Sequence, residues 1–243
     1  MHCSPLRLLP ALLLMACAAC SSLTTAEVPS ETPLAPPEHM PVAAMSTCAK
    51  SKWLPSTLKR NEQGVTTLAL LVGADGKLSR VELISSSGSA ELDSAAKATL
   101  ASCRFAPAIV GGKPVERWTR GVYVWSIDDD RRPSSLARQL SDRAALGQAD
   151  AQYALYVLLS ENKEYAAGDK AAALTGLLMH SAQAGFCPAK FSLGNRYMHG
   201  KGSARDAAQA REWFRQAEAC GHPMARQALE ELDAASEAPA SGK

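Results

Sequence analysis

The first regular pattern in the chain is an alternation of residues along "VTTLALLVGADGKLSRVELISSSG", residues 65–88. The stretch from Val65 to Val72 carries apolar side chains at both odd and even positions, which is typical of a strand covered on both faces. Asp75-Gly76 favours a hairpin turn, and a second strand is expected from Leu78 to Ser85. The pattern therefore predicts a β-hairpin.

After Gly88 the apolar positions change to a spacing of three and four residues, which predicts a helix with Ser89 as its N-cap. The segment "RWTRGVYVWSI", residues 117–127, alternates again and predicts a third strand. A short helix, two strands, a longer helix and a strand favour an α+β fold, in which helices lie on a three-stranded antiparallel sheet as two layers. The predicted helical face consists of Leu92, Ala95, Ala96, Thr99 and Leu100.

From about residue 134 to residue 234 the chain repeats itself. Three similar segments begin at Gly147, Gly185 and Gly221. Each unit is expected to be two antiparallel helices, which cannot bury their apolar face alone and therefore stack. The sequence predicts that an all-α helical-repeat solenoid follows the α+β domain.

Residues 1–20 have the pattern of an export signal, with an apolar run too short for the roughly 20 residues that cross a bilayer. Their end resembles the lipobox of bacterial lipoproteins. Cys20 is favoured as the lipidated residue because two serines follow it, and Cys17 is the alternative because a leucine stands three residues before it. An ordinary cleaved signal remains open. Residues 21–46 are rich in proline and predict a linker, and residues 235–243 are expected to be a disordered tail.

Charge and composition exclude several functions. The net charge is +2 and aromatic residues make up 5% of the chain, so nucleic-acid binding is not expected. His180, His199 and His222 do not share an i, i+4 helix face, and surface or capping roles suit them better than a metal site. The charged run at residues 128–135 is interpreted as a solvated connector. No cofactor is expected.

Two segments have the Ser-x-x-Lys spacing of a serine acylase, with Ser94 and Lys97 in one and Ser56 and Lys59 in the other. The companion motifs Ser-Asp-Asn and Lys-Thr-Gly are absent from the sequence. The serines around Gly88 are better explained as a strand-to-helix corner, where hydroxyls and Asp93 satisfy free backbone amides. No catalytic residue is predicted.

Residues 47–128 resemble the C-terminal domain of TonB, although Leu54-Pro55 stands where that family has Tyr-Pro. The matching motifs occur in the family's order: Asp75-Gly76, Ser86-Ser87-Gly88, Leu92-Asp93-Ser94-Ala95-Ala96, Phe105-Ala106-Pro107-Ala108 and Gly112-Lys113-Pro114-Val115. The resemblance implies binding of an extended peptide at an exposed sheet edge. We expect the edge to be the last strand, Val115 to Ser126, with Val115, Trp118, Val122 and Val124 as the binding residues.

Residues 134–234 resemble the SEL-one-like repeat, a relative of the tetratricopeptide repeat. The clearest copy is "AKFSLGNRYMHGKGSARDAAQAREWFRQAEACG", residues 189–221. The first copy lacks the Gly-x-Gly loop that this copy has at Gly200 and Gly202. The resemblance implies a second protein-binding surface on the repeats.

Four cysteines follow the signal, and an even number in an exported chain suggests two disulfides. Cys48 lies before the first short helix and Cys103 at the end of the long helix, so a Cys48–Cys103 bridge would tie the N-terminal arm to the domain. Cys187 begins and Cys220 ends an antiparallel helix pair, so a Cys187–Cys220 bridge would clamp one repeat. Buried free thiols are the alternative for the second pair.

Together these features predict a non-catalytic interaction protein of the bacterial cell envelope. We expect it in the periplasm, anchored to the outer membrane by an N-terminal lipid and contacting the membrane only there. The expected partners are envelope proteins or peptides, with outer-membrane transporters as one class suggested by the TonB resemblance. A purely structural envelope lipoprotein is the first alternative, and a serine acylase of cell-wall or β-lactam chemistry is the second.

Overall fold

The structure is a computed structural model that describes residues 39–44, 47–49, 54–127, 134–160, 162–165 and 168–237. The predicted signal with Cys17 and Cys20, most of the predicted linker, and residues 238–243 lie outside these ranges. Among the described residues no helix is long and apolar enough to cross a membrane.

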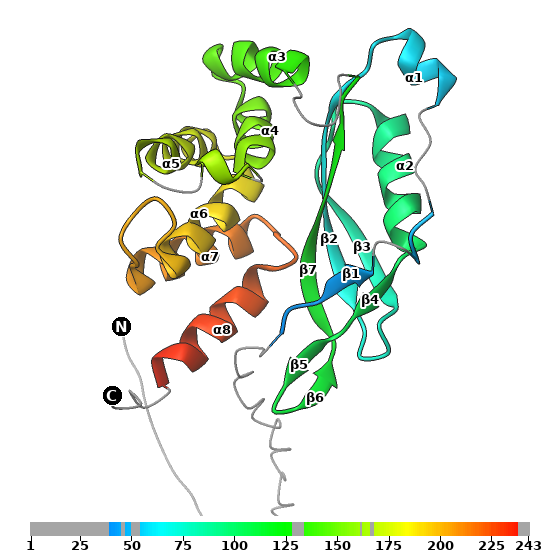
Figure 1. Cartoon of the computed structure of the whole chain (residues 1–243). Helices are drawn as coiled ribbons and strands as arrows, with labels where there is room; N and C mark the ends of the chain where they lie inside the picture. The colour runs from blue at the N-terminus through cyan, green and yellow to red at the C-terminus, as the bar shows by residue number, and fades with distance from the viewer. Residues whose placement is uncertain are drawn as a thin grey trace, which may run out of the picture. The chain divides into compact units, whose positions relative to one another are not determined.

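Three strands form the main sheet (Figure 1). They are β2 (Gly64–Val72), β3 (Leu78–Ser85) and β7 (Arg117–Trp125), paired antiparallel in the order β3-β2-β7. The predicted three-stranded antiparallel sheet is confirmed. Its central strand is β2, so β3 and β7 are the two edges.

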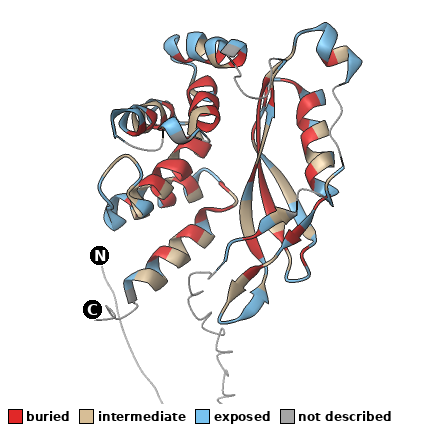
Figure 2. Cartoon of the chain, viewed as in Figure 1, coloured by how far each residue is buried: buried red, intermediate tan, exposed pale blue. Residues whose placement is uncertain are grey.

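Helices cover both faces of this sheet. On one face, α2 (Ala90–Ala101) packs against β2, and Leu68 and Leu70 are buried in a cluster with Leu92. On the other face, Val65 and Ala69 are buried in clusters with residues of the C-terminal helices. Figure 2 shows the resulting buried band along β2. The predicted pair of layers is present, and the repeat helices add a third.

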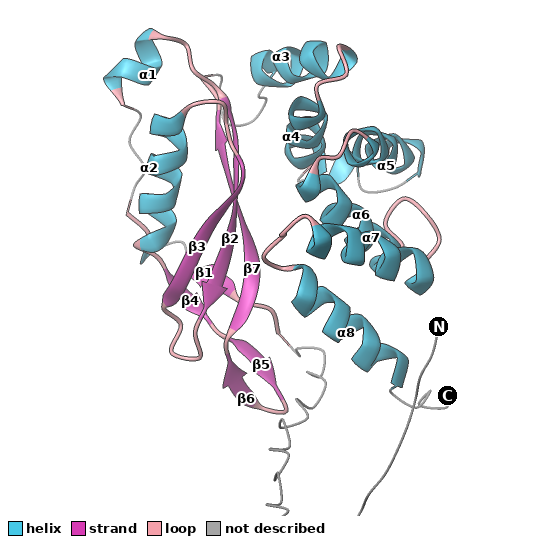
Figure 3. Ribbon diagram, turned by 180° about the vertical axis from the view of Figure 1, so that it is seen from behind, coloured by secondary structure: helices cyan, strands magenta, loops and turns pink. Residues whose placement is uncertain are grey.

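Two small antiparallel pairs flank the main sheet (Figure 3). One joins β1 (Val42–Ala44) to β4 (Arg104–Ala106), so three residues within the predicted linker form a strand. The other joins β5 (Ala108–Val110) to β6 (Lys113–Val115) through Gly111 and Gly112, which both have positive φ. Glycine adopts this backbone at little cost, so the chain can reverse here.

The prediction that Val115 belongs to the last strand is therefore wrong. Val115 lies in β6 and pairs with Ala108, because the glycine turn folds it back onto β5. The last strand of the main sheet begins two residues later, at Arg117, and ends at Trp125.

The C-terminal part consists of helices that each pack against the next along the chain, which confirms a helical-repeat region. Between α6 and α7 the contact is close because Gly194 has no side chain. A Cβ atom there would lie 2.5 Å from the ring of Phe214. The helices are α3 (Ser134–Ala145), α4 (Ala149–Ser160), α5 (Gly168–Gln183), α6 (Cys187–His199), α7 (Ala207–Ala219) and α8 (Ala225–Glu237), with a 3₁₀ turn at Lys163–Tyr165 after α4.

The structure contains two disulfide bonds. Cys48 is bonded to Cys103, which joins the N-terminal arm to the end of α2. Cys187 is bonded to Cys220, which joins the first residue of α6 to the C-cap of α7. Each disulfide links two segments that are distant in sequence, and so reduces the conformational entropy of the unfolded chain.

The corner between β3 and α2 is organised by the buried carboxylate of Asp93. It accepts hydrogen bonds from the Thr66 hydroxyl at 2.8 Å, the Ser86 hydroxyl at 2.5 Å, and both the hydroxyl and the backbone N–H of Ser87. Ser89 is the N-cap of α2, and its hydroxyl accepts from the Leu92 N–H. The serines at this corner therefore serve the turn, as predicted.

Replacing Asp93 should test this corner. Asp93→Ala leaves several buried donors without an acceptor, and each such loss costs about 1–3 kcal/mol. We expect the free energy of unfolding to fall by about 3 kcal/mol, measured by urea denaturation. Ser94→Ala, which removes an exposed hydroxyl on the next residue, is the control and should change stability by less than about 0.5 kcal/mol. Equal effects of the two variants would contradict the role given to Asp93.

His222 caps the start of α8 from a buried position. Its Nδ1 accepts a hydrogen bond from the Met224 N–H at 3.3 Å, and its ring stacks on Phe191 with centroids 4.1 Å apart. Burial lowers the pKa of His222 to about 4. The predicted capping role fits this contact, although the ring is buried.

Because the folded state holds His222 neutral, the unfolded state binds the extra proton between pH 6.5 and 4. The free energy of unfolding should therefore be highest above pH 6.5 and fall by about 3 kcal/mol as the pH approaches 4. In His222→Asn, where the amide oxygen can replace Nδ1 as acceptor, this part of the pH dependence should disappear. Urea denaturation of both proteins between pH 7 and pH 4 measures it, and identical slopes would contradict the assignment.

Candidate functional site

One end of the β7 edge is closed by α8. The backbone N–H of Trp118 donates to Oε1 of Gln227 at 2.8 Å, and Nε2 of Gln227 donates to the carbonyl of Trp118 at 3.3 Å. The carboxamide of Gln227 thus makes the two hydrogen bonds that a residue of a neighbouring strand would make. A strand added to β7 therefore cannot extend past Trp118.

A buried ion pair holds α8 at this position. Nη1 of Arg117 lies 2.7 Å from Oε1 of Glu231, and the Arg117 side chain is only 1% exposed. Burial raises the pKa of Glu231, while the charge of Arg117 opposes that rise. Removing Arg117 would leave the carboxylate of Glu231 largely buried without this counter-charge, which is destabilising.

Farther along β7 the edge is open. Pairing with β2 is unbroken from Trp125 to Arg117, so successive residues turn their backbone groups alternately toward β2 and away from it. The backbone groups of Trp118 point away from β2, toward Gln227. Val122 and Val124 lie an even number of residues farther along the strand, so their backbone groups also point away from β2. Within the described part of the chain, no group bonds the N–H or carbonyl of Val122 or Val124 on that side.

An apolar pocket lies along this open stretch. It has a volume of about 460 Å³ and includes the whole of β7 from Thr119 to Val124 in its lining. Gly121 lets the floor pack closely, because a Cβ atom there would lie 2.9 Å from the methyl carbons of Leu70 and Leu100. The remaining lining residues come from the N-terminal arm, β2, α2 and β4: Pro41, Ala43, Cys48, Leu70, Thr99, Leu100 and Phe105. We call this the apolar pocket.

A second pocket, of about 450 Å³, borders β7 at Thr119 and Arg120 and is lined mainly by α6. Arg120, Arg196, His199 and Lys201 bring basic side chains to it. Partial burial lowers the pKa of His199, and the neighbouring charges of Lys201 and Arg205 lower it further. We call this the basic pocket.

The residues expected to bind at the edge differ in how far they are buried. Trp118 and Val122 are partly buried against the helical clusters, whereas Val124 is 38% exposed. Val115 is absent from the edge, as described above. Sequence reasoning missed Arg120 and Arg196, because a basic pocket between a strand and a distant helix leaves no local motif.

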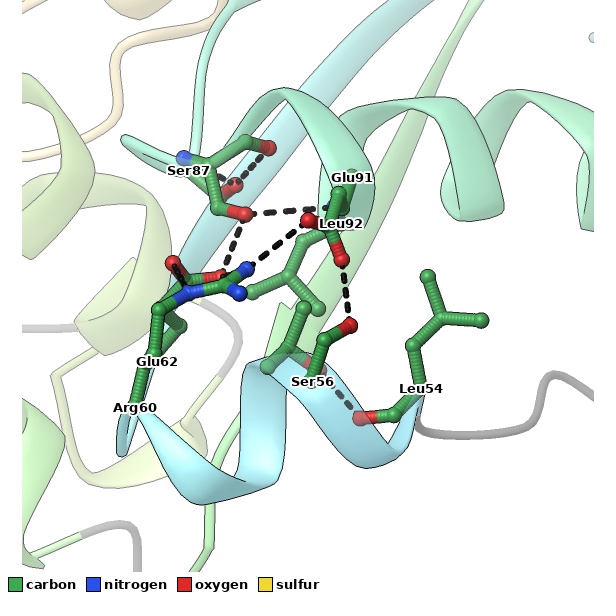
Figure 4. A network of polar contacts seen from close by, with 9 residues as sticks. Leu54, Ser56, Arg60, Glu62, Ser87, Glu91 and Leu92 are labelled. Atoms are coloured by element: carbon green, nitrogen blue, oxygen red, sulfur yellow. Dashed lines mark hydrogen bonds and ion pairs between the residues drawn. The ribbon is translucent and has the colours of Figure 1, made fainter.

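The serines of the acylase hypothesis are engaged in structural hydrogen bonds. The Ser94 hydroxyl donates to the Ala90 carbonyl within α2 at 2.8 Å. The Ser56 hydroxyl in α1 (Pro55–Lys59) donates to Oε2 of Glu91 at 2.6 Å, and Arg60 links Glu91 to Glu62 (Figure 4). Hydrogen bonds from Ser56 and then Arg60 lower the pKa of Glu91. This network joins α1 to α2.

The histidines considered as metal ligands are dispersed. His180 is exposed on α5, His199 lies at the basic pocket and His222 caps α8. In the ranges that the structure describes, no three residues of the histidine, cysteine, aspartate or glutamate types are placed to hold a metal ion.

Comparison with known proteins identifies the first module. A family model, the Gram-negative bacterial TonB protein C-terminal, matches residues 55–127, which is less than half of the chain. A comparison with curated proteins finds no match.

Two solved structures are similar to part of the chain. One is a protective antigen from uropathogenic Escherichia coli strains that displays an SLR fold, with 33% identity over 38% of this chain and 20% of that one, and a TM-score of 0.34. The other is a Sel1 repeat protein from Oxalobacter formigenes, with 24% identity over 44% of this chain and 30% of that one, and a TM-score of 0.38. This chain thus spans less than a third of either protein.

The repeat organisation is evident from the order in which α3 to α8 pack. Residues 55–127 are similar to the TonB C-terminal domain, and the helical repeats of α3 to α8 follow them.

Proposed function

We propose that this chain is a non-catalytic interaction protein of the cell envelope that binds an extended peptide by strand addition at β7. The observation that carries the proposal is the outward backbone of Val122 and Val124, which has no bonding partner among the described residues. Exposed edges are usually protected because they recruit other strands. An edge left open beside two pockets suits a peptide.

The two pockets can make strand addition selective for particular peptide side chains. Hydrogen bonds to a strand edge do not depend on the peptide's sequence, so selectivity must come from its side chains, which alternate between the two faces. The apolar pocket follows β7 over the same residues that offer their backbone. Gln227 defines where the peptide must end.

The match to the TonB C-terminal family and the two disulfides support a periplasmic location. We propose segments of envelope proteins as partners, including periplasm-facing peptides of outer-membrane transporters. Lipidation at Cys20 or Cys17 and an outer-membrane anchor remain predictions. A second partner is proposed for the helical repeats, on surfaces other than those that α4, α6 and α8 use against the sheet.

Proline at Val124 tests strand addition. Proline removes the outward N–H but none of the bonds to β2, so an edge strand tolerates it. We expect Val124→Pro to weaken binding of a labelled synthetic peptide, SVTVQVTVS, at least about tenfold, or about 1.4 kcal/mol, measured by fluorescence anisotropy. Val124→Ala shortens the side chain but keeps the N–H, and should stay within about threefold of the unaltered chain.

The peptide backbone provides an independent check. N-methylation of alternate amides blocks only those that face the protein, so one set of methylated peptides should lose binding and the other should retain it. Equal binding to Val124→Pro and Val124→Ala would contradict strand addition. Absence of binding by any form of the peptide to the folded chain would favour the structural lipoprotein instead.

A further inference from the structure

Strand β3 is the second edge of the main sheet, and part of its outer side is open (Figure 3). Leu71 of β2 lies opposite Trp118, whose backbone groups point away from β2, so Leu71 turns its own backbone groups toward β3. Its partner Arg80 therefore bonds to β2, and Val81 and Leu83 point their backbone groups away from β2. Among the described residues, no group bonds the N–H or carbonyl of Val81 or Leu83 on that side.

The two faces beside this open stretch leave space for another strand. Helix α2 contacts all three strands, so it lies over the middle of the sheet. On the opposite face, a cleft of about 540 Å³ lies between α8 and the side chains of Arg80 and Glu82. Strand β4 bonds to the hairpin at its turn, where the N–H of Phe105 donates to the Gly76 carbonyl. A second strand can therefore approach the open part of β3 from the side.

The charged side chains of β3 make the strand complementary to itself. Arg80 and Glu82 project from the same face with their charged groups 3.5 Å apart, and 63% and 40% of their side chains are exposed. When a second β3 runs antiparallel with Val81 opposite Val81, Arg80 of each copy lies opposite Glu82 of the other. These are non-hydrogen-bonded pairs, in which opposed side chains come closest. Opposite charges at such positions stabilise strand pairing.

Neighbouring registers lack this match. A shift of one residue sets backbone groups that point outward against groups that point toward β2. A shift of two residues sets Glu82 opposite Glu82, or Arg80 opposite Arg80 in the other direction, and like charges directly opposed are destabilising. The sequence of β3 therefore selects one antiparallel register for pairing with its own copy.

We propose that β3 pairs with β3 of a second copy of this chain, antiparallel about a two-fold axis at Val81, so that the two three-stranded sheets become one. The contact is isologous and closes after two copies. It covers the exposed side chain of Leu83, which comes to lie opposite Ser79 of the second copy. Both β7 edges lie outside this contact, so dimerisation does not depend on the peptide binding proposed above.

Charge reversal tests the proposed register. In sedimentation velocity, the full chain should form dimers with a dissociation constant of about 10 µM, as expected for a small contact. Arg80→Glu opposes two glutamates at each charged position and Glu82→Arg opposes two arginines, so each variant alone should dimerise at least about tenfold more weakly. An equimolar mixture of the two variants restores both opposite-charge pairs, and its heterodimers should form with an affinity within about threefold of the unaltered chain.

Two further measurements accompany the charge reversal. Arg215→Glu is the matched control, because it reverses an exposed charge on α7, and it should dimerise like the unaltered chain. Amide hydrogen exchange should show the Val81 N–H becoming protected as the concentration is raised and dimers form. Recovery of dimers in the mixture excludes a folding defect as the cause of weak dimerisation, since each chain keeps its own substitution.

Three outcomes would overturn the proposal. A chain that remains monomeric at about fifty times the expected dissociation constant would show that the charges protect this edge from pairing. Dimers that neither variant weakens would place the contact on another surface. Variants that dimerise weakly and do not recover when mixed would contradict the opposition of Arg80 and Glu82. Failure of peptides to bind at β7 would overturn the proposed function and leave this inference standing.

Discussion

The site depends on the contact between the second face of the sheet and the repeat helices. β2 is apolar on both faces, so a single covering helix would leave Val65 and Ala69 in water. The repeats bury them, and the ion pair of Arg117 with Glu231 fixes α8 at the end of β7. Hydrophobic burial supplies the driving force, and the polar contacts determine the alignment. A small α+β domain and a helical array thereby pack as one unit.

This contact shapes the edge of β7. α8 saturates it at Trp118, and the rest is left between the apolar and basic pockets. The N-terminal arm contributes to both pockets, with Met40 in one and Pro41 and Ala43 in the other. The arm continues to Cys48, which is bonded to Cys103. The disulfide thus holds in place a segment that borders the site.

Local features of the fold could be predicted from the sequence. Alternation and Asp75-Gly76 predict the β2–β3 hairpin, and Ser89 can be predicted as a cap because capping depends on neighbouring residues. The alternating pattern alone assigns Val115 to the last strand, whereas the local signal of a reversal at Gly111-Gly112 places it in β6. The strand at Val42–Ala44 has no local signal, since its partner lies some 60 residues away and proline precedes it.

The site itself was only partly predictable. The edge strand could be inferred from a family resemblance, but the Trp118–Gln227 pairing joins residues 109 positions apart and leaves no trace in either segment. In the sequence, Arg196 is one polar residue on an amphipathic helix. Its burial, and the absence of a carboxylate near it among the described residues, result from tertiary packing and cannot be predicted locally.

Amide hydrogen exchange along β7, followed by NMR in the free protein, tests the central claim most directly. The backbone N–H groups of Gly121 and Tyr123 should exchange slowly because they face β2. The N–H of Trp118 should also exchange slowly because it donates a hydrogen bond to Gln227. Those of Val122 and Val124 should exchange much faster, because they face the open side. Uniform protection along the whole strand would mean that this edge is already occupied and would contradict the account.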